Sequence, residues 1–510
     1  MSAIDRPQQL PTRSPLHSTA WMLTATLLLA RLLPAALQPG MFMDGVTYAT
    51  IARNMAAGEG DFWHPVLFGP GCDTHEQPPL TYWMESLLFR VLGDHFWVEK
   101  LYSVMMAIGT VALIAAIWRL LLRDRPELRD CSWLPVAMWA CLPSWSWMYD
   151  SNLMENTLGL FALASVYASL RAANSPRAWL GWTVAAALAL TGAVLAKGPV
   201  GMFPLVTPLV IAVTLRRVQA ARMLVIAEGL SLLFLLAFGL LLLQRGAYDY
   251  MVTYFHQQVV LGVLGQREVF HPRLGRLEIF WQMALQLIVP ALAAAGLIAW
   301  ARRRASGIAA ESNRPKAELL FCLLTAASAS LPIAISRKQS GHYAFPSYSF
   351  YALAFAIWCA PAVIGLLGSA ADRSLQAMRL SRGNRLLRGL AIGGSALVLL
   401  ATCFMAGRPH RDKDVYHDTL VMGHFVPPRS TIGLTPELFG DFAIQMYMVR
   451  WDGIWPIHST AGHEFCLGAI DAPAPPGYTA VAADLRRYRL FERADTTTER
   501  VGRGNKPSLH

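Results

Sequence analysis

Long apolar runs dominate this sequence and leave it few folds to adopt. Each run is about 17 to 25 residues long, and a helix of roughly 20 apolar residues spans the hydrocarbon core of a bilayer. The runs cover residues 19–37, 98–122, 132–149, 154–172, 178–196, 199–215, 222–244, 279–301, 317–335, 343–366 and 387–406. A β-barrel would instead show alternating segments of about ten residues. The sequence therefore predicts an all-α polytopic membrane protein with about 11 transmembrane helices.

Basic residues gather in the connections that this topology places on one side. The formal net charge is +11, and no nucleic-acid partner is needed to explain it, because Arg and Lys mark cytoplasmic loops. The residues concerned are Arg123, Arg125, Arg129, Arg171, Arg177, Arg216, Arg217, Arg222, Arg302, Arg303, Arg304, Arg314, Lys316, Arg373, Arg379, Arg382, Arg385 and Arg388. We expect a cytoplasmic N-terminal tail at 1–18, a membrane domain at 19–406, and outer loops at 38–97, 245–278 and 336–342.

Two further segments are not predicted to cross the membrane. Leu80 to Gly93 is apolar but short, and its Pro-Pro start predicts a juxtamembrane helix, re-entrant or interfacial, on the outer face. Residues 407–510 gain proline and short alternating runs, which predict a small α/β extramembrane domain with a disordered end. This domain is small for independent folding, so we expect it to dock on the membrane part.

Acidic residues crowd the first outer loop, and they point to chemistry at a membrane surface. They are Asp44, Glu59, Asp61, Asp73 and Glu76. No P-loop, GxGxxG, CxxC or HExxH pattern occurs, so the sequence supports no ATP-driven reaction and no soluble nucleotide cofactor. A divalent cation could bind Asp44 and Glu76, although two carboxylates are too few ligands to define a site.

The chain has seven cysteines. Only Cys72 and Cys466 would share the oxidising outer side, so the sequence allows a disulfide between them.

Four short strings occur in a fixed order on the predicted outer face. They are Met43–Ala49, His75–Trp83, Ala196–Gly201 and Ser336–Tyr343. Together they resemble the C-type (GT-C) integral-membrane glycosyltransferases, and within them the bacterial branch of lipid A aminoarabinose transferases and relatives of protein O-mannosyltransferases. The resemblance covers roughly residues 20–360. It implies inverting transfer of a sugar from a polyprenyl-phosphate carrier to lipid A, a glycan or a protein hydroxyl, at the outer, periplasmic face of the bacterial cytoplasmic membrane.

The resemblance assigns roles to two carboxylates. Asp44 would be the catalytic base, and Glu76 would orient the acceptor or share a divalent ion with Asp44. From the residues alone, Asp44 could equally cap a helix from Gly45 to Ala57. Gly45 stands where the family often has a second acidic residue. Gln77 stands where aminoarabinose transferases carry a basic residue, which weakens that assignment.

Cations for the donor phosphate come from two of the strings. Lys197 precedes a helix break at Gly198-Pro199, and Arg337 and Lys338 break the positive-inside pattern on the outer side. Charges at that boundary need anionic partners, and a lipid phosphate is one. The remaining candidates are supporting residues, namely Glu155, His75, Gln77, His256, Arg267 and His271.

Two other readings of the same sequence remain. Polytopic topology also fits a transporter, although we see no internal repeat and no cluster of polar residues near the bilayer midplane. Gly45 and Gln77 also fit a binding protein that kept the fold without catalysis.

Overall fold

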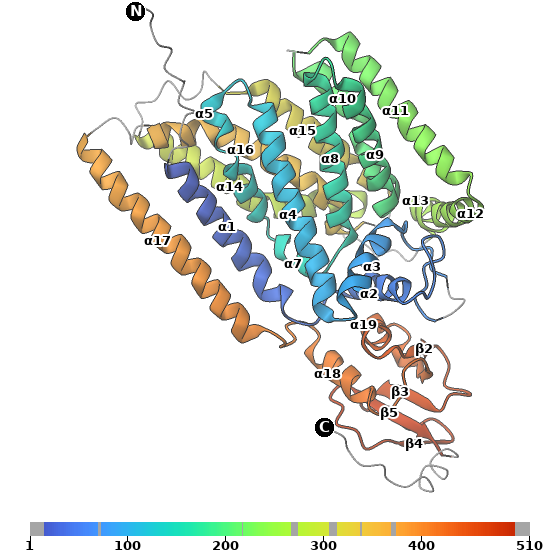
Figure 1. Ribbon diagram of the computed structural model, residues 1–510. Coiled ribbons are helices and arrows are strands. Elements are labelled where there is room, and N and C mark those ends of the chain that lie inside the picture. Colours follow the sequence, from blue (N-terminus) through green and yellow to red (C-terminus); the bar gives the residue numbers. More distant parts are fainter. Residues whose placement is uncertain are drawn as a thin grey trace, which may run out of the picture.

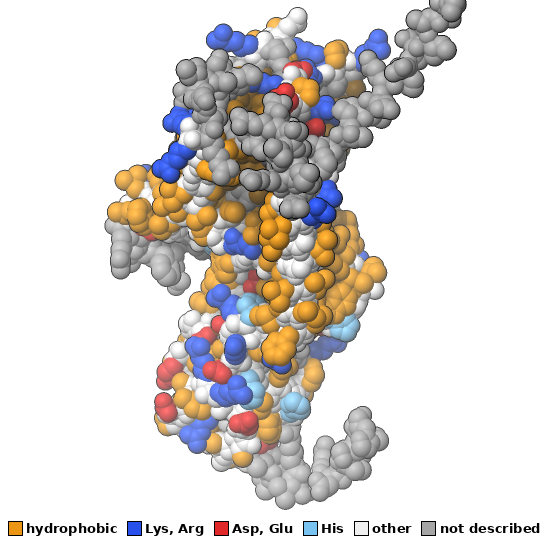
Figure 2. Space-filling view, turned by 90° about the vertical axis from the view of Figure 1, so that its left-hand side faces the viewer, with side chains coloured by type: hydrophobic (Ala, Val, Ile, Leu, Met, Phe, Trp, Pro, Cys, Tyr) orange, Lys and Arg blue, Asp and Glu red, His pale blue; other side chains and the backbone are white. Residues whose placement is uncertain are grey.

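The computed structural model describes residues 15–69, 73–216, 218–266, 274–304, 314–336, 339–368 and 374–494. Its long helices form one bundle, and a small domain with a β-sheet lies below one end of that bundle (Figure 1). Figure 2 shows hydrophobic side chains over the middle of the molecule and charged side chains toward both ends. This distribution matches a helical membrane protein.

Eight helical stretches in the described part are long and apolar enough to cross a membrane. They comprise α1 (Pro15–Ala36), α4 (Phe96–Leu121), α9 (Trp179–Lys197) with η1 (Gly198–Val206) and α10 (Thr207–Thr214), α11 (Ala220–Leu242), α14 (Glu278–Arg304), α15 (Lys316–Ser330), α16 (Phe345–Gly368) and α17 (Ser374–Met405). The expected polytopic helical fold is confirmed, whereas the count of eleven spans stays a prediction.

The difference in count arises at three places. α8 (Met154–Asn174) is a full helix but falls outside those eight stretches. The predicted spans at 178–196 and 199–215 form one stretch joined by the tight turns of η1. A single helix at 132–149 is wrong, because the chain forms α6 (Trp133–Ala140) and α7 (Trp145–Asp150) with Pro143 between them, where a missing N–H favours a break.

The bundle is built from neighbouring pairs of helices. α8 packs along α9, α1 along α17, and α16 against both α14 and α15. In Figure 1 the α1 and α17 pair lies at one edge of the bundle and α11 at the opposite edge. Large aromatic side chains such as Trp118, Trp139 and Phe350 fill the interior.

Short helices cover the end of the bundle near the small domain. They are α2 (Met43–Ala56), α3 (Leu80–Leu92), α12 (Arg245–Tyr254), η2 (Phe255–Val260) and α13 (Leu261–Leu264). The short helix expected from Leu80 is present and begins directly after Pro79. α2 begins at Met43 with Phe42 as its N-cap, so the alternative that Asp44 caps a helix is wrong. The Asp44 carboxylate instead lies in the first turn.

The C-terminal region forms the expected small α/β unit. Its elements are α18 (Lys413–Met422), β1 (Thr431–Leu434), η6 (Pro436–Leu438), α19 (Phe442–Tyr447), η7 (Met448–Asp452), β2 (Trp455–Ile457), β3 (Phe465–Ala469), β4 (Tyr478–Ala480) and β5 (Tyr488–Arg493). The sheet order is β2-β1-β3-β5-β4, with parallel pairs around β1 and antiparallel pairs around β5. The end expected to be disordered, from about Thr496, lies outside the described residues.

Two buried ionic groups attach the C-terminal unit to the bundle. Arg450 donates hydrogen bonds to Glu99 at 2.8 Å and to Asp94 at 2.7 Å, and its side chain is only 3% exposed. Charges taken out of water need such partners, since an unpaired buried ion is strongly destabilising. The contact therefore supports the expectation that this unit docks on the membrane part.

The second group centres on Asp150 at the end of α7. Lys100 donates to Asp150 Oδ1 at 2.6 Å and to the Gly40 carbonyl at 3.0 Å, and His410 Nε2 donates to Asp150 Oδ2 at 2.7 Å. Burial raises the pKa of Asp150, but Lys100 and His410 together lower it further, so its net pKa lies below the usual value. The group ties the first outer loop to the start of the C-terminal unit.

One cysteine of the expected pair can be assessed. Cys466 is buried in β3 with a free thiol, and Cys72 lies outside the described residues. The disulfide is therefore not part of the described structure.

Candidate active site

A buried ion pair at this end of the bundle joins two of the sequence candidates. Glu155 lies in the first turn of α8 and Lys197 is the last residue of α9. Lys197 Nζ is 2.7 Å from Glu155 Oε1, and the two residues are 8% and 1% exposed. Their charges are therefore held in a poorly solvated environment, where each depends on the other.

The last string of the sequence closes on the same pair. His342 Nε2 lies 3.6 Å from Glu155 Oε1, and Lys197 Nζ lies 5.3 Å from the centre of the Tyr343 ring. His342 Nδ1 shares a hydrogen bond of 2.7 Å with the Ser340 hydroxyl, which orients the imidazole. The strings at 196–201 and 336–343 thus form one cluster.

The helix break after Lys197 has a steric cause. Gly198 has a φ of +78°, and a Cβ at this position would collide with the Tyr254 hydroxyl. That hydroxyl donates to the Lys197 carbonyl at 3.4 Å. Only glycine allows both the left-handed backbone and the close approach of Tyr254. The break expected at Gly198-Pro199 therefore lets α12 pack over Lys197.

Two buried tyrosines connect the first two strings to this cluster. The rings of Tyr48 in α2 and Tyr82 in α3 lie 5.9 Å apart. Burial raises the pKa of Tyr48, and the negative charges of Asp44 and Glu155 raise it further. Burial likewise raises the pKa of Tyr82, followed by contributions from Tyr250 and Glu76. Both phenols therefore remain protonated hydrogen-bond donors.

The Tyr82 hydroxyl is a donor without an acceptor in the described part of the chain. It is buried and makes no hydrogen bond with any described residue. Such a group is costly unless a water or a ligand satisfies it. On the α3 side, Thr81 donates to the Ala196 carbonyl at 3.4 Å and fixes the strings at 75–83 and 196–201 against each other.

Asp44 is half-buried one turn before Tyr48. Its neighbour Gly45 packs so closely on the Ser151 carbonyl that a Cβ would overlap it. The second carboxylate that the resemblance implies at this position is thus sterically excluded here. A single acidic residue remains in this turn of α2.

The residues of the second string, His75–Trp83, differ in how they contribute to this cluster. Glu76 is exposed, although its charge still raises the pKa values of Tyr48 and Tyr82. His75 lies with its ring 4.8 Å from that of Tyr250, and burial lowers its pKa. Gln77 uses its backbone carbonyl, which accepts from the Tyr250 hydroxyl at 2.6 Å. These contacts position α12 beside the cluster.

Of the remaining predicted site residues, the structure describes only His256. His256 lies on the exposed face of η2. Four candidates lie outside the described residues, namely Arg267, His271, Arg337 and Lys338. Sequence reasoning assigned no role to Tyr48, Tyr82, His342 or Tyr343, although all of them occur within the strings. The sequence did contain a signal for these four residues, because aromatic side chains recur in the strings beside charged residues.

A metal site receives no support from the described residues. Within those ranges no group of three or more His, Cys, Asp or Glu side chains could hold a metal ion. The divalent ion between Asp44 and Glu76 stays a prediction.

Known proteins resemble this chain in sequence and in fold. Residues 76–241 match the family described as dolichyl-phosphate-mannose-protein mannosyltransferase. This segment contains Glu76, Glu155 and Lys197. No curated protein sequence gives a significant match.

Solved structures match nearly the whole chain. ArnT from Cupriavidus metallidurans in the apo state has a TM-score of 0.61 at 16% identity, over 94% of this chain and 99% of that one. Its complex with undecaprenyl phosphate has a TM-score of 0.60 at 16% identity, with 93% and 98% covered. The archaeal oligosaccharyltransferase AglB from Archaeoglobus fulgidus, in complex with an inhibitory peptide and a dolichol-phosphate, has a TM-score of 0.51 at 12% identity. The match covers 88% of this chain and 69% of that one. The fold that the resemblance implies is confirmed, because the chain is a helical membrane protein with the fold of ArnT.

Proposed function

We propose that this protein is an inverting glycosyltransferase that moves a sugar from a polyprenyl-phosphate donor to an acceptor of the cell envelope. The observation that carries the proposal is the meeting of the strings at one end of the bundle. Lys197 and His342 come from two separate elements, and both lie within ion-pair distance of Glu155 on a third. A reaction that releases a lipid phosphate needs such a cationic group beside a proton acceptor.

The donor class rests on the relatives. The ArnT structure contains undecaprenyl phosphate and the AglB structure contains a dolichol-phosphate. Both are phosphorylated polyprenyl lipids, and the matched family is described by a dolichyl-phosphate sugar. We infer that the same class of carrier binds beside Lys197.

In the proposed reaction an acceptor hydroxyl attacks the anomeric carbon, and its proton passes to the Asp44 carboxylate. The bond between that carbon and the phosphate oxygen breaks, and the phosphate leaves with the electron pair. A single displacement of this kind inverts the anomeric carbon. Lys197 has three N–H donors, so its contact with Glu155 leaves donors for the phosphate. Arg337 and Lys338 would add charge, and the Tyr82 hydroxyl would donate a neutral hydrogen bond.

The location follows from the charge pattern of the sequence. We place the site at the outer face of the bacterial cytoplasmic membrane, facing the periplasm. The acceptor belongs to one of three classes, which are lipid A, another glycan or a protein hydroxyl. A transporter would show substrate movement without bond cleavage, and a non-catalytic protein of this fold would bind the carrier without turnover.

One experiment tests the proposal against both alternatives. Purified protein in lipid nanodiscs is given a radiolabelled sugar on a short-chain polyprenyl phosphate, and release of the label from the lipid is followed with envelope extracts as acceptor. We expect release by the wild type and by Lys316→Met, because Lys316 is exposed and distant in sequence from the strings. Lys197→Met should be at least tenfold slower. Equal rates for both variants, or an inactive wild type, would reject the proposal.

A further inference from the structure

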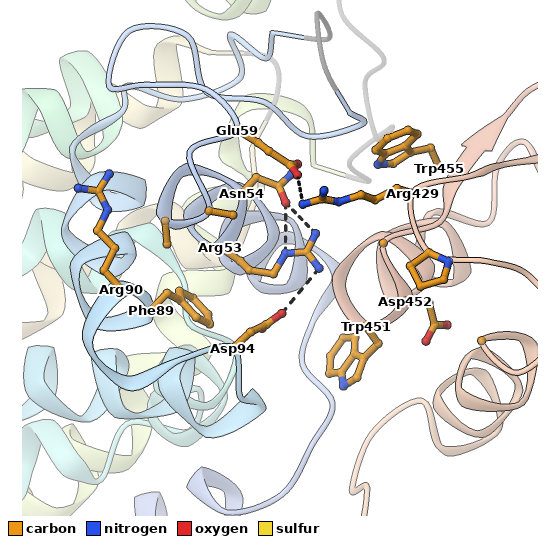
Figure 3. Close-up of a pocket in the computed structure, with 15 residues that line it drawn as sticks. Arg53, Asn54, Glu59, Phe89, Arg90, Asp94, Arg429, Trp451, Asp452 and Trp455 are labelled. Atoms are coloured by element: carbon orange, nitrogen blue, oxygen red, sulfur yellow. Dashed lines mark hydrogen bonds and ion pairs between the residues drawn. The ribbon is translucent and has the colours of Figure 1, made fainter. Parts of the chain in front are cut away.

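A polar cavity lies away from the cluster around Lys197. Its volume is about 550 Å³, and it opens between the α2–α3 helices and the C-terminal unit (Figure 3). Cavities of about 300 to 1,000 Å³ are typical of small-molecule sites. Nothing in the proposed reaction uses this one.

The lining of the cavity contains three arginines and three acidic residues. Arg53, Arg90 and Arg429 face it together with Glu59, Asp94 and Asp452. Figure 3 shows the Arg53 guanidinium between Asn54 and Asp94, and Arg429 beside Glu59. Arg429 donates to Glu59 at 2.8 Å, and Arg53 lies 3.9 Å from Asp94. A phosphate or a polyanion would compete with Glu59 for Arg429 and with Asp94 for Arg53, so this lining disfavours an anionic ligand.

One carboxylate in the lining lacks a partner among the described residues. Asp452 Oδ2 is buried and accepts no hydrogen bond from any of them. Beside it, Trp451, Trp455 and Phe89 contribute aromatic surface to the same lining. Aromatic faces next to hydrogen-bonding groups of both kinds suit a ligand that has apolar faces and many hydroxyls. A sugar ring has both properties, whereas an acyl chain would leave the charged groups unsatisfied.

The cavity is also connected to the candidate base by one rigid element. Asp44 lies in the first turn of α2 and Arg53 in its last turn. At 1.5 Å per residue the two are about 14 Å apart along the helix axis. A ligand of more than one sugar ring could therefore fill the cavity and still present a hydroxyl near Asp44.

We propose that this cavity binds a saccharide segment of the acceptor, and hence that the acceptor is a glycan of at least two sugar units. The identification of the bound saccharide as the acceptor rests on the proposed glycosyl transfer. The binding itself does not depend on turnover. Trp455 and Asp452 are the residues on which recognition depends, and Arg429 on the rim supplies a donor.

Equilibrium dialysis with full-length protein in nanodiscs tests the proposal. The probes are radiolabelled short oligosaccharides in three forms, neutral, uronic-acid-containing and phosphorylated, and a Ser/Thr-rich peptide as the rival ligand. We expect at least one oligosaccharide to bind the wild type, and Trp455→Ala and Asp452→Asn to weaken it about tenfold. Phe442→Ala and Asp471→Asn are matched controls, because both residues are exposed on the same unit and lie outside the cavity. They should bind as the wild type does.

Arg429→Gln separates a loss of binding from a loss of folding. The Arg429 side chain is 72% exposed, so its replacement should cost little stability. It should also weaken saccharide binding and raise the KM for an acceptor saccharide more than it lowers kcat. The inference is overturned if no oligosaccharide binds the wild type, if all cavity variants bind equally, or if the peptide alone binds. Saccharide binding that depends on the cavity in a protein without donor turnover would reject the proposed function and keep the binding site.

Discussion

Glu155 Oε1 and Lys197 Nζ lie 2.7 Å apart, and both side chains are almost completely buried. This contact gives Lys197 two separable roles. It balances the Glu155 carboxylate, and in the proposed reaction it also stabilises the departing phosphate.

The two roles make different predictions for Lys197→Met. Loss of one charge-assisted hydrogen bond, worth roughly 1.5–3 kcal/mol, should lower kcat about 10- to 100-fold. The bare Glu155 should also lower stability, since breaking a buried pair costs about 3–5 kcal/mol. The double variant Lys197→Met/Glu155→Gln should recover stability, measured by thermal unfolding, without recovering turnover. Recovered turnover would mean that Lys197 only balances Glu155.

Asp44→Asn should abolish sugar transfer and leave the protein folded. Asparagine keeps the size of the side chain but cannot accept the acceptor's proton. Turnover and size-exclusion profiles measured in parallel check both parts. Asp249→Asn is the control, because Asp249 is an exposed carboxylate on α12. Turnover by Asp44→Asn above about a tenth of wild type would exclude Asp44 as the base.

Gly45→Ala should destabilise the protein, and Gly45→Asp should do so more strongly. Any Cβ overlaps the Ser151 carbonyl, and overpacking of this kind typically costs about 1–3 kcal/mol. Introducing an acidic residue at this position should therefore not raise activity. Gly239→Ala in α11 has open space around its Cβ and should be neutral in the same thermal assay. An equally stable Gly45→Ala would contradict the packing at Ser151.

Asp452 should make stability depend on pH. Burial raises its pKa from 3.8 to about 7, so the folded state holds a proton that the unfolded state has lost. Folding stability should therefore fall as pH rises from about 4 to 7 and stay level above that. The full shift corresponds to at most about 4 kcal/mol, and partial exposure should reduce it. Asp452→Asn should melt a few degrees higher than wild type at pH 8, with the difference shrinking toward pH 4.5. A difference that is constant with pH would count against a buried proton.

Cysteine labelling checks the orientation. In a background free of native cysteines, Glu76→Cys should react with a membrane-impermeant maleimide added to intact cells, and Glu127→Cys should react only after lysis. Both positions are exposed in the structure, so burial does not confuse the comparison. The opposite pattern would overturn the outer location of the site.

The sequence predicted those features of the structure that depend on residues close together in the chain. The apolar runs located the long helices. One string located Lys197, and Glu155 was a supporting candidate outside the strings, because polar residues at the ends of α8 and α9 stand out against apolar neighbours. Pro143 was a visible break signal that the length of the apolar run at 132–149 obscured. The start of α2 at Met43 could not be predicted, because its N-cap, Phe42, has no side chain that can cap a helix.

Contacts between residues far apart in the chain could not be predicted from the sequence. Lys100 reads as an ordinary basic residue near a helix end, and only the fold shows that it reaches both Gly40 and Asp150. The cavity beside Trp455 was equally hidden, since it forms where α2, α3 and the C-terminal unit meet. Contacts between segments this far apart are set by tertiary packing rather than by local preference.

The contact between Glu99 and Arg450 has a consequence for how the protein is made. During synthesis Glu99 leaves the ribosome early, in α4, whereas Arg450 follows only after the membrane helices are complete. Until then the Glu99 carboxylate has no guanidinium beside it, and a buried carboxylate without a partner is unfavourable. A nascent chain that stalls after α17 would thus carry a built-in defect at the membrane surface, and membrane quality-control proteases could distinguish it from the finished protein.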